Sequence, residues 1–322
     1  MKPKPISPHL LSMITKMFLR GLALITAFSL WHDASNVFAA SPTGQTFATP
    51  RDAVAALEKA ATANSLPDLR AIFGPSFSEI ANPDLVQTTN EVTAFATALR
   101  ETNRLVATGE RRLALEFGRE NTEFPVPLIE SPRGWIFDTE AGVEELINRR
   151  IGRNELDVLE VARTYVQAQR EYAGRDRDDD DVLEYAQKFH SAPGTKNGLF
   201  WSPELDGTMS PLGPFMAEAE AAGYRKKAES ERQPFHGYFF KILTRQGKHA
   251  PGGKYDYVIN GNMIGGFALV AWPAEYGRTG IMTFIVNQQG RVFEKDLGRS
   301  ATEDAPGMKD YDPDDTWSVS RE

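Results

Sequence analysis

The sequence predicts an α+β fold in which N-terminal helices precede an antiparallel sheet, a helical middle segment follows, and an antiparallel β-meander comes last. Helical spacing of apolar residues occurs before residue 101 and again within residues 141–222. Short apolar blocks typical of strands occupy residues 111–137, and similar blocks separated by glycines fill the chain after residue 235. Because helices and strands fall in separate runs instead of alternating, the pattern favours the α+β class.

The first 39 residues are predicted to be a cleaved signal peptide. Basic residues without an acid occupy the first twenty positions, an uncharged stretch covers residues 21–31, and small residues allow cleavage after Ala39 or Ala40. A retained membrane anchor is the alternative, but the uncharged stretch is about half of the roughly 20 residues that cross a bilayer. We therefore expect a periplasmic or secreted protein with no stable transmembrane anchor after cleavage.

Changes in periodicity and the positions of turn residues divide the rest of the chain into four segments. They are an N-terminal α+β lobe at residues 40–140, a helical middle segment at 141–230 with an acidic loop at 176–181, a β-meander lobe at 231–300, and an acidic tail at 301–322.

The N-terminal lobe is predicted to begin with three helices. Thr49 can cap the first, and Pro50 suits its first position. The second covers residues 66–73, and the third covers residues 90–101. Three strands are predicted to follow, at residues 111–117, 124–129 and 134–137.

The middle segment is predicted to hold four helices. The first covers residues 141–151 and ends at Gly152, and Asn154 caps a second helix that reaches Tyr172. In this second helix one face carries apolar residues at spacings of three and four: Val158, Val161, Tyr165, Ala168 and Tyr172. The other two helices are expected at residues 182–189 and 211–222.

The C-terminal lobe is predicted to be a meander of five short strands, and residues 317–319 can add an edge strand. A hairpin turn is expected at residues 287–290. The five strands are expected at residues 237–244, 255–259, 266–271, 280–286 and 291–296.

The acidic loop has the spacing of a calcium-binding loop. Asp176, Asp178 and Asp180 stand at positions 1, 3 and 5, Val182 can offer a backbone carbonyl at position 7, and Glu184 stands at position 9. Predicted helices on both sides supply the helix–loop–helix context. These five residues are therefore the candidate calcium ligands.

Two positions of the loop depart from the calcium pattern. Asp181 stands at position 6, where a glycine normally makes the turn, and Gln187 stands at position 12, where a bidentate glutamate normally closes the site. A calcium site here is expected to be weak. The alternative is a solvated acidic loop whose last aspartate caps the following helix.

His236 is the candidate catalytic residue of the chain. It stands at the start of a predicted strand, where a buried, hydrogen-bonded histidine and a general base are alternative interpretations. The chain has no cysteine, no G-x-S-x-G motif and no paired histidine ligands, which argues against thiol, serine and zinc chemistry. The many acidic residues offer carboxylate pairs for glycoside cleavage, but the sequence selects none of them.

Charge argues against nucleic acid and anionic membranes as partners. The formal net charge is −8, and cleavage after Ala39 removes more basic than acidic residues. One dense mixed cluster is predicted to form intramolecular ion pairs, with an anion site as the alternative. It consists of Arg149, Arg150 and Arg153 with Glu144, Glu145 and Glu155.

A set of motifs occurs in one order along nearly the whole mature chain. They are Trp135-Ile-Phe-Asp138-Thr-Glu-Ala-Gly142, Arg149-Arg-Ile-Gly-Arg-Asn-Glu155, Glu184-Tyr-Ala-Gln187, Gly198-Leu-Phe-Trp201, His236-Gly-Tyr238 and Gly265-Gly-Phe-Ala-Leu-Val-Ala-Trp-Pro273. Together they resemble a bacterial exported family catalogued as domain of unknown function 2950. The resemblance implies no reaction, cofactor or catalytic residue. Residues 235–298 are also similar to the β-meander of pilin and pseudopilin heads, which implies no shared function.

We expect a non-catalytic module that binds an envelope protein or a cell-wall component, with calcium as a candidate ligand. The expectation rests on the lack of a recognisable nucleophile, metal triad or cofactor motif, beside the many aromatic residues and glycines of the C-terminal sheet. The alternative is a periplasmic hydrolase that acts on envelope glycans or peptides through carboxylates, with His236 assisting.

Overall fold

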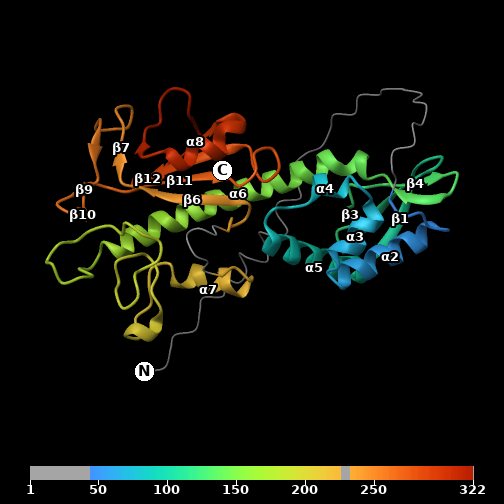
Figure 1. Ribbon diagram of the computed structural model, residues 1–322, viewed down its shortest axis with the longest axis horizontal. Helices are drawn as coiled ribbons and strands as arrows, with labels where there is room; N and C mark the ends of the chain where they lie inside the picture. The colour runs from blue at the N-terminus through green and yellow to red at the C-terminus, as the bar shows by residue number, and fades with distance from the viewer. Residues whose placement is uncertain (1–43, 226–232, 322) are drawn as a thin grey trace. The chain divides into compact units, whose positions relative to one another are not determined.

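The structure is a computed structural model, and it describes residues 44–225 and 233–321. The described residues form one compact unit. Helices and mainly antiparallel sheets build this unit, which confirms the predicted α+β class (Figure 1). The predicted signal peptide, residues 1–39, lies outside the described residues.

The N-terminal lobe is a five-stranded sheet with helices packed on it. Strand order is β1-β2-β4-β5, with β3 beside β2. The strands are β1 (Asn103–Gly109), β2 (Arg112–Phe117), β3 (Thr122–Glu123), β4 (Leu128–Ser131) and β5 (Gly134–Phe137). The helices are α2 (Pro50–Thr62), α3 (Leu66–Phe73), α4 (Phe77–Ile80) and α5 (Leu85–Glu101). Leu57, Phe73, Leu99 and Leu115 share one hydrophobic cluster, so α2, α3, α5 and the sheet form one core.

Local signals set where the helices of this lobe begin. The Thr49 side chain accepts a hydrogen bond from the Asp52 backbone N–H, as predicted for the start of α2. Helix α5 begins five residues earlier than predicted, because the Asp84 side chain accepts hydrogen bonds from the backbone N–H groups of Val86 and Gln87.

A single helix, α6 (Thr139–Tyr172), replaces the two helices predicted on either side of Gly152. The prediction was wrong because Asn154 is not a cap: its side chain is fully buried, accepts a hydrogen bond from Gln87 and donates one to the carbonyl of Thr279. The predicted apolar face is confirmed, since Val158, Tyr165 and Tyr172 are buried.

The helix predicted over residues 182–189 is absent, and the chain there is irregular apart from one β-bridge between Tyr185 and Met263. The backbone N–H of Tyr185 donates to the carbonyl of Met263, and that of Ala186 donates to the side chain of Gln169. These tertiary partners satisfy the groups that a helix would have paired within itself. Further along, η1 (Pro203–Leu205) precedes α7 (Gly213–Ala221), which lies within the predicted residues 211–222.

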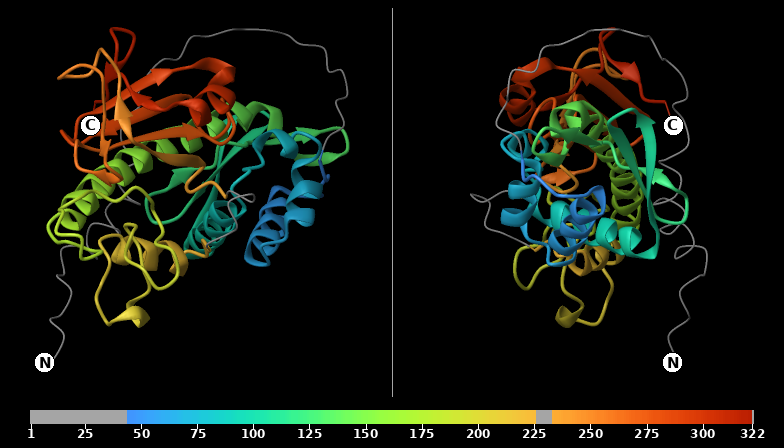
Figure 2. Two further views of the ribbon diagram at one scale, coloured as in Figure 1. Left: turned by 60° about the vertical axis from the view of Figure 1, so that its left-hand side comes forward. Right: turned by 90° about the vertical axis from the view of Figure 1, so that its right-hand side faces the viewer.

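The C-terminal lobe is a five-stranded sheet of order β15-β13-β12-β11-β6. Its strands are β6 (Tyr238–Leu243), β11 (Ala268–Pro273), β12 (Met282–Asn287), β13 (Val292–Asp296) and β15 (Ser318–Val319). All of β11 is buried, and Tyr165 of α6 and Ala305 of α8 (Ala301–Gly307) lie in the same cluster. Helix α6 runs along the C-terminal sheet (Figure 2). The predicted hairpin turn at 287–290 and the edge strand near 317–319 are confirmed.

Short strands extend beyond this sheet. Tyr257 divides the predicted strand at 255–259 into two short strands. Its side chain is buried, and its backbone N–H donates to the carbonyl of Thr244. Asn260 and Gly261 both have positive φ and make a two-residue hairpin turn. The remaining elements are β7 (Arg245–Gln246), β8 (Tyr255–Asp256), β9 (Val258–Ile259), β10 (Asn262–Met263), η3 (Gly298–Ser300) and β14 (Asp310–Tyr311).

Candidate functional site

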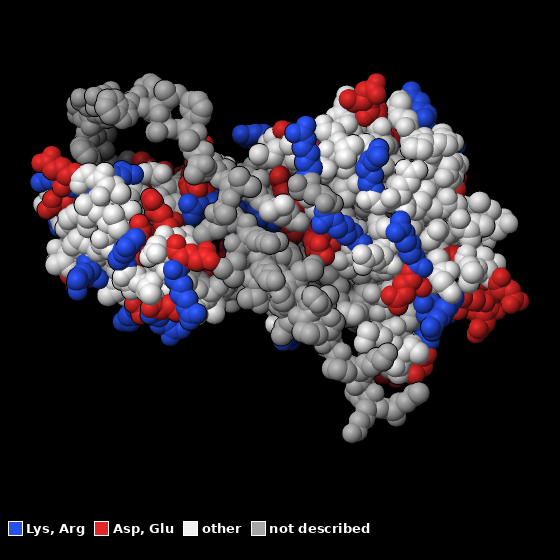
Figure 3. Space-filling view, turned by 180° about the vertical axis from the view of Figure 1, so that it is seen from behind, with Lys and Arg blue, Asp and Glu red and all other residues white. Residues whose placement is uncertain are grey.

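The acidic loop follows the end of α6 and brings three carboxylates together. Oxygen atoms of Asp176, Asp178 and Asp180 all lie within 4.8 Å of one another. The Asp176 carboxylate accepts backbone hydrogen bonds from residues 178, 179 and 181, at 3.2, 2.9 and 2.9 Å. Acidic side chains gather on the surface where this loop lies (Figure 3). The three predicted aspartate ligands are therefore neighbours in space.

The turn at position 6 forms without the usual glycine. Asp181 has φ of 64°, and Asp179 has φ of 60°. Aspartate is one of the few residue types that tolerate this left-handed conformation, because its short side chain bonds locally. The substitution of aspartate for glycine therefore does not prevent the loop from closing around its carboxylates.

The other predicted ligands do not join the three aspartates. Glu184 accepts a hydrogen bond from the backbone N–H of Met263 at 3.1 Å and lies outside the three-carboxylate group. The backbone N–H of Val182 donates to the Asp180 carboxylate, and the Gln187 side chain donates to the carbonyl of Gly261. The loop consequently lacks both the following helix and the bidentate carboxylate of a full calcium loop.

Asn262 is a neighbour of this loop that sequence reasoning missed. Its side chain donates to the Asp180 carboxylate at 2.7 Å, from a position 82 residues further along the chain. The only local signal was the preceding Asn260-Gly261 dipeptide, which is typical of a hairpin turn. This contact and the Glu184–Met263 bond tie the loop to the β9–β10 hairpin.

The electrostatics of the loop reflect crowding of like charges. Partial burial, followed by the carboxylates of Asp180 and Asp176, raises the pKa of Asp178. Burial would also raise the pKa of Asp176, but its backbone N–H donors outweigh that effect and lower it. Burial raises the pKa of Glu184 as well. A bound cation would relieve the repulsion between the aspartates.

Exposed apolar side chains lie beside the loop. Leu183, Ile259 and Ile264 are 60%, 47% and 44% exposed, and we call these three residues the hairpin patch. The Tyr185–Met263 bridge holds the segment after Leu183 against β10, which connects the patch to the acidic loop.

His236 forms a pair with Asp157 of α6. The imidazole Nδ1 lies 2.5 Å from the Asp157 carboxylate, and the two side chains are 34% and 27% exposed. His236 has φ of 49°, an unusual conformation for a histidine. The side chain is partly buried and hydrogen-bonded, so both interpretations of His236, a buried, hydrogen-bonded histidine and a general base, stay predictions. Asp157 stands 79 residues earlier in the chain, and no sequence signal pointed to it.

A buried polar network surrounds this pair. The buried Asp84 carboxylate accepts hydrogen bonds from the Tyr224 hydroxyl at 2.8 Å and from the Gly237 N–H at 3.3 Å. Burial, and then the charge of Asp84, raises the pKa of Tyr224 well above its usual value. Since Tyr224 also contacts the His236 backbone, the network fixes the segment that carries the histidine.

The arginine cluster forms ion pairs only in part. Arg149 pairs with Glu145 at 2.6 Å, and Arg153 pairs with Glu91 at 3.2 Å. Arg150 is buried and donates instead to the carbonyls of Ile80 and Ala81, and burial lowers its pKa. The cluster therefore connects α6 to the N-terminal helices.

The fold and these sites define an α+β protein with an acidic loop after the long helix α6 and a histidine–aspartate pair whose aspartate lies on that helix. The chain belongs to the family described as protein of unknown function (DUF2950), whose model matches residues 44–320. Neither a curated protein nor a solved structure matches the chain. The likeness of its C-terminal sheet to pilin heads stays a prediction. Within residues 44–225 and 233–321, none of the helices has the length and apolar character to cross a bilayer.

Proposed function

We propose that this chain is an exported envelope protein that acts by binding, and that calcium in the acidic loop organises its binding surface. The observation that carries the proposal is that oxygens of Asp176, Asp178 and Asp180 lie within 4.8 Å of one another. Hydrogen bonds connect this loop to β10, which lies next to the hairpin patch. With three carboxylates and no bidentate closing ligand, the affinity should fall near the 10⁻⁴–10⁻³ M that is typical of extracellular calcium modules.

The hairpin patch supplies the contact surface in this proposal. Asp180 and Glu184 each bond to β10, so a cation in the loop would restrain β10 and the neighbouring Ile264. A protein or cell-wall component of the envelope would then bind the patch more strongly in calcium, because less motion is lost on binding.

A thermal melt of the mature chain, starting at Ser41, tests the cation site. We expect about 1 mM calcium to raise the midpoint relative to chelator, because a ligand bound only by the folded state stabilises it by mass action. The double variant Asp176→Ala and Asp178→Ala should lose this shift. The matched control is Glu218→Ala with Glu220→Ala, which removes two exposed charges from α7 and should retain it. Equal shifts in both double variants would refute a specific site.

Site-specific photo-crosslinking in intact cells tests the binding surface. A photoreactive residue at Ile264 should give a discrete adduct that weakens in chelator. The same residue at Leu85, which is 65% exposed in the N-terminal lobe, is the control and should give none. If the two positions give the same adducts, or if Ile264 gives none, the hairpin patch is not the contact surface.

Export is tested separately. The protein recovered from the cell envelope should begin near residue 40 or 41 by mass spectrometry, since the small residues at 39 and 40 suit signal peptidase. Recovery of the chain with its first 39 residues intact, in the cytoplasm, would contradict the proposal.

The second candidate function is hydrolysis of envelope glycans or peptides, and the His236–Asp157 pair favours it. An imidazole whose Nδ1 is held by a carboxylate can use its other nitrogen as a general base. If purified cell-wall material is turned over, His236→Ala should abolish turnover and Asp157→Asn should reduce it. His249→Ala is the matched control, because His249 also pairs with an aspartate, Asp312, at 3.0 Å. Absence of turnover, or its loss in all three variants, would count against this function.

A further inference from the structure

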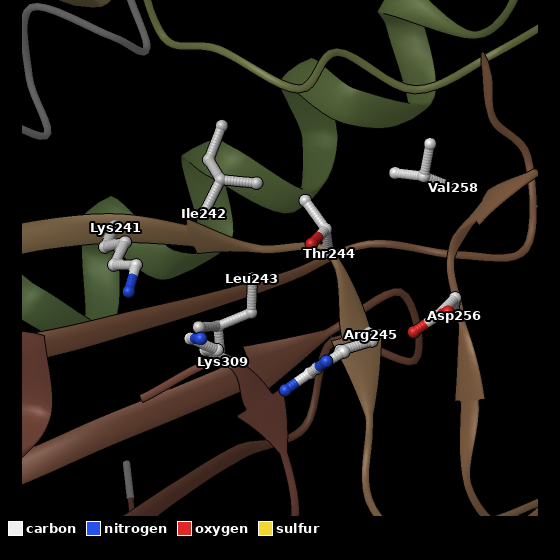
Figure 4. A pocket seen from close by; sticks show the side chains of 8 residues that line it. All are labelled: Lys241, Ile242, Leu243, Thr244, Arg245, Asp256, Val258 and Lys309. Carbon is white, nitrogen blue, oxygen red and sulfur yellow. The ribbon is translucent and has the colours of Figure 1, made fainter. Parts of the chain in front are cut away.

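A basic pocket lies beside β6 and β7, apart from the residues of the acidic loop and of the histidine–aspartate pair. Its volume is about 340 Å³. It is lined by Lys241, Ile242, Leu243, Thr244, Arg245, Asp256, Val258 and Lys309. In Figure 4 the side chains of Lys241, Lys309 and Arg245 follow one another across the pocket, and Asp256 lies at its far end.

The charge of this lining is opposite to that of the whole chain. Three lining residues are basic and one is acidic, whereas the chain carries a formal net charge of −8. Asp310 lies in ionic contact with the Nε of Arg245 and offsets part of the positive charge. Lys309 is exposed and, within the described ranges, has no hydrogen bond or ion pair. Its ammonium group is therefore available to a ligand.

One basic group of the pocket is held in a fixed position. The Lys241 ammonium donates to the carbonyls of Pro306 and Met308, at 2.8 and 2.7 Å, which holds it in place. Leu243 is only 1% exposed, and Ile242 and Val258 pack against the same core. In Figure 4 Ile242 points to the opposite side of β6 from Lys241 and Leu243, so the basic groups lie together on one side of the strand. Basic groups held in this way suit a ligand that carries a negative charge.

We propose that this pocket binds a small anion with a carboxylate or phosphate group, and that Lys309 and Arg245 contact the charge. Arginine and lysine are the usual protein partners of both groups. The pocket shares no residue with the acidic loop or with the histidine–aspartate pair, so this proposal can be tested apart from the two proposed functions.

Nuclear magnetic resonance titration of the mature chain, with inorganic phosphate and with succinate at constant ionic strength, tests the pocket. We expect saturable shifts of the amides of residues 241–245 and 256–258, with Kd on the order of millimolar for at least one probe. Tighter binding of phosphate would assign a phosphate ligand, and tighter binding of succinate would assign a carboxylate.

Lys309→Gln should weaken binding at least about fivefold, because it removes a direct charge partner from the ligand. Lys59→Gln is the control: it removes an exposed charge at the end of α2 and should leave the affinity unchanged. Two results would overturn the proposal: no saturable shifts at these amides with either probe, or equal weakening in both variants. The titration of the unmodified chain decides the question even if Lys309→Gln folds poorly.

Discussion

At the scale of single residues, Asn154 shows how tertiary contacts change the role of a side chain. By itself, an asparagine after an arginine-rich helical stretch favours a helix N-cap. In the structure its amide accepts from Gln87 at 2.7 Å and donates to the Thr279 carbonyl at 2.8 Å, with no exposed surface. One buried amide thus joins α5, α6 and the turn before β12.

We expect Asn154→Ala to lower the free energy of unfolding by about 2–4 kcal/mol, because the Gln87 amide and the Thr279 carbonyl would be left buried without partners. Urea denaturation measures the change. Asn90→Ala is the control, since Asn90 is exposed and makes one side-chain bond, to the carbonyl of Ala222, so its loss should cost less than about 1 kcal/mol. Similar costs for the two variants would contradict the importance of the buried amide.

The raised pKa of Asp178 predicts a pH dependence of calcium binding. In the folded loop the pKa of Asp178 lies above the ordinary carboxyl value of 3.8. The stability that this group contributes is therefore present at low pH and is lost as the pH rises through the raised pKa. Calcium needs the ionised form and must displace that proton. The calcium-induced rise of the melting midpoint should therefore be larger at about pH 7 than at about pH 4.5. A shift that is equal at both pH values would contradict this coupling.

At the scale of elements, α6 is the feature that organises the chain. Its first turns pack on the N-terminal core through Leu146, and its later turns pack on the C-terminal sheet through Tyr165 and Val166. A glycine in a helix interior is unfavourable by about 1 kcal/mol relative to alanine. Packing at both ends offsets this cost at Gly152, which is why the helix continues through a residue that normally ends one.

Two glycines of α6 provide a matched test of this continuity. Gly152→Ala should stabilise the protein by about 0.5–1 kcal/mol, because an added Cβ meets nothing within 4 Å and alanine favours helix. Gly142→Ala should destabilise it by about 1–3 kcal/mol, because the Cβ would lie 2.7 Å from a methyl group of Val126. Thermal unfolding measures both. A destabilising Gly152→Ala would indicate a helix break at that residue.

At the scale of the whole molecule, polar contacts join the two hydrophobic cores. Arg278 of the C-terminal lobe donates to the carbonyl of Ala81 at 2.6 Å and to that of Ser78 at 3.1 Å. Arg150 of α6 also donates to the carbonyl of Ala81, and the Tyr224 hydroxyl donates to the Asp84 carboxylate. Because these groups are paired across the junction, opening it would leave several of them without partners.

We therefore expect the mature chain to unfold in a single transition. Trp135 packs on the N-terminal core, whereas Trp201, Trp272 and Trp317 pack on the C-terminal one. A Trp135→Phe variant reports on the C-terminal core, and a variant with the other three replaced by phenylalanine reports on the N-terminal core. Their fluorescence midpoints in urea should each coincide with that variant's own far-UV circular dichroism. A separate fluorescence midpoint for either core would show that the cores unfold independently.

The sequence by itself determined the α+β class, the Thr49 cap, most strand positions, the 287–290 turn and the spacing of the loop aspartates. These features depend on neighbours a few residues apart, where periodicity and capping act. Only the tertiary structure decided that α6 runs unbroken, that residues 182–189 form no helix, and which groups meet at His236 and Asp180. Their partners lie tens of residues away, as Asp157 does from His236, and a buried polar group adopts whatever conformation satisfies it.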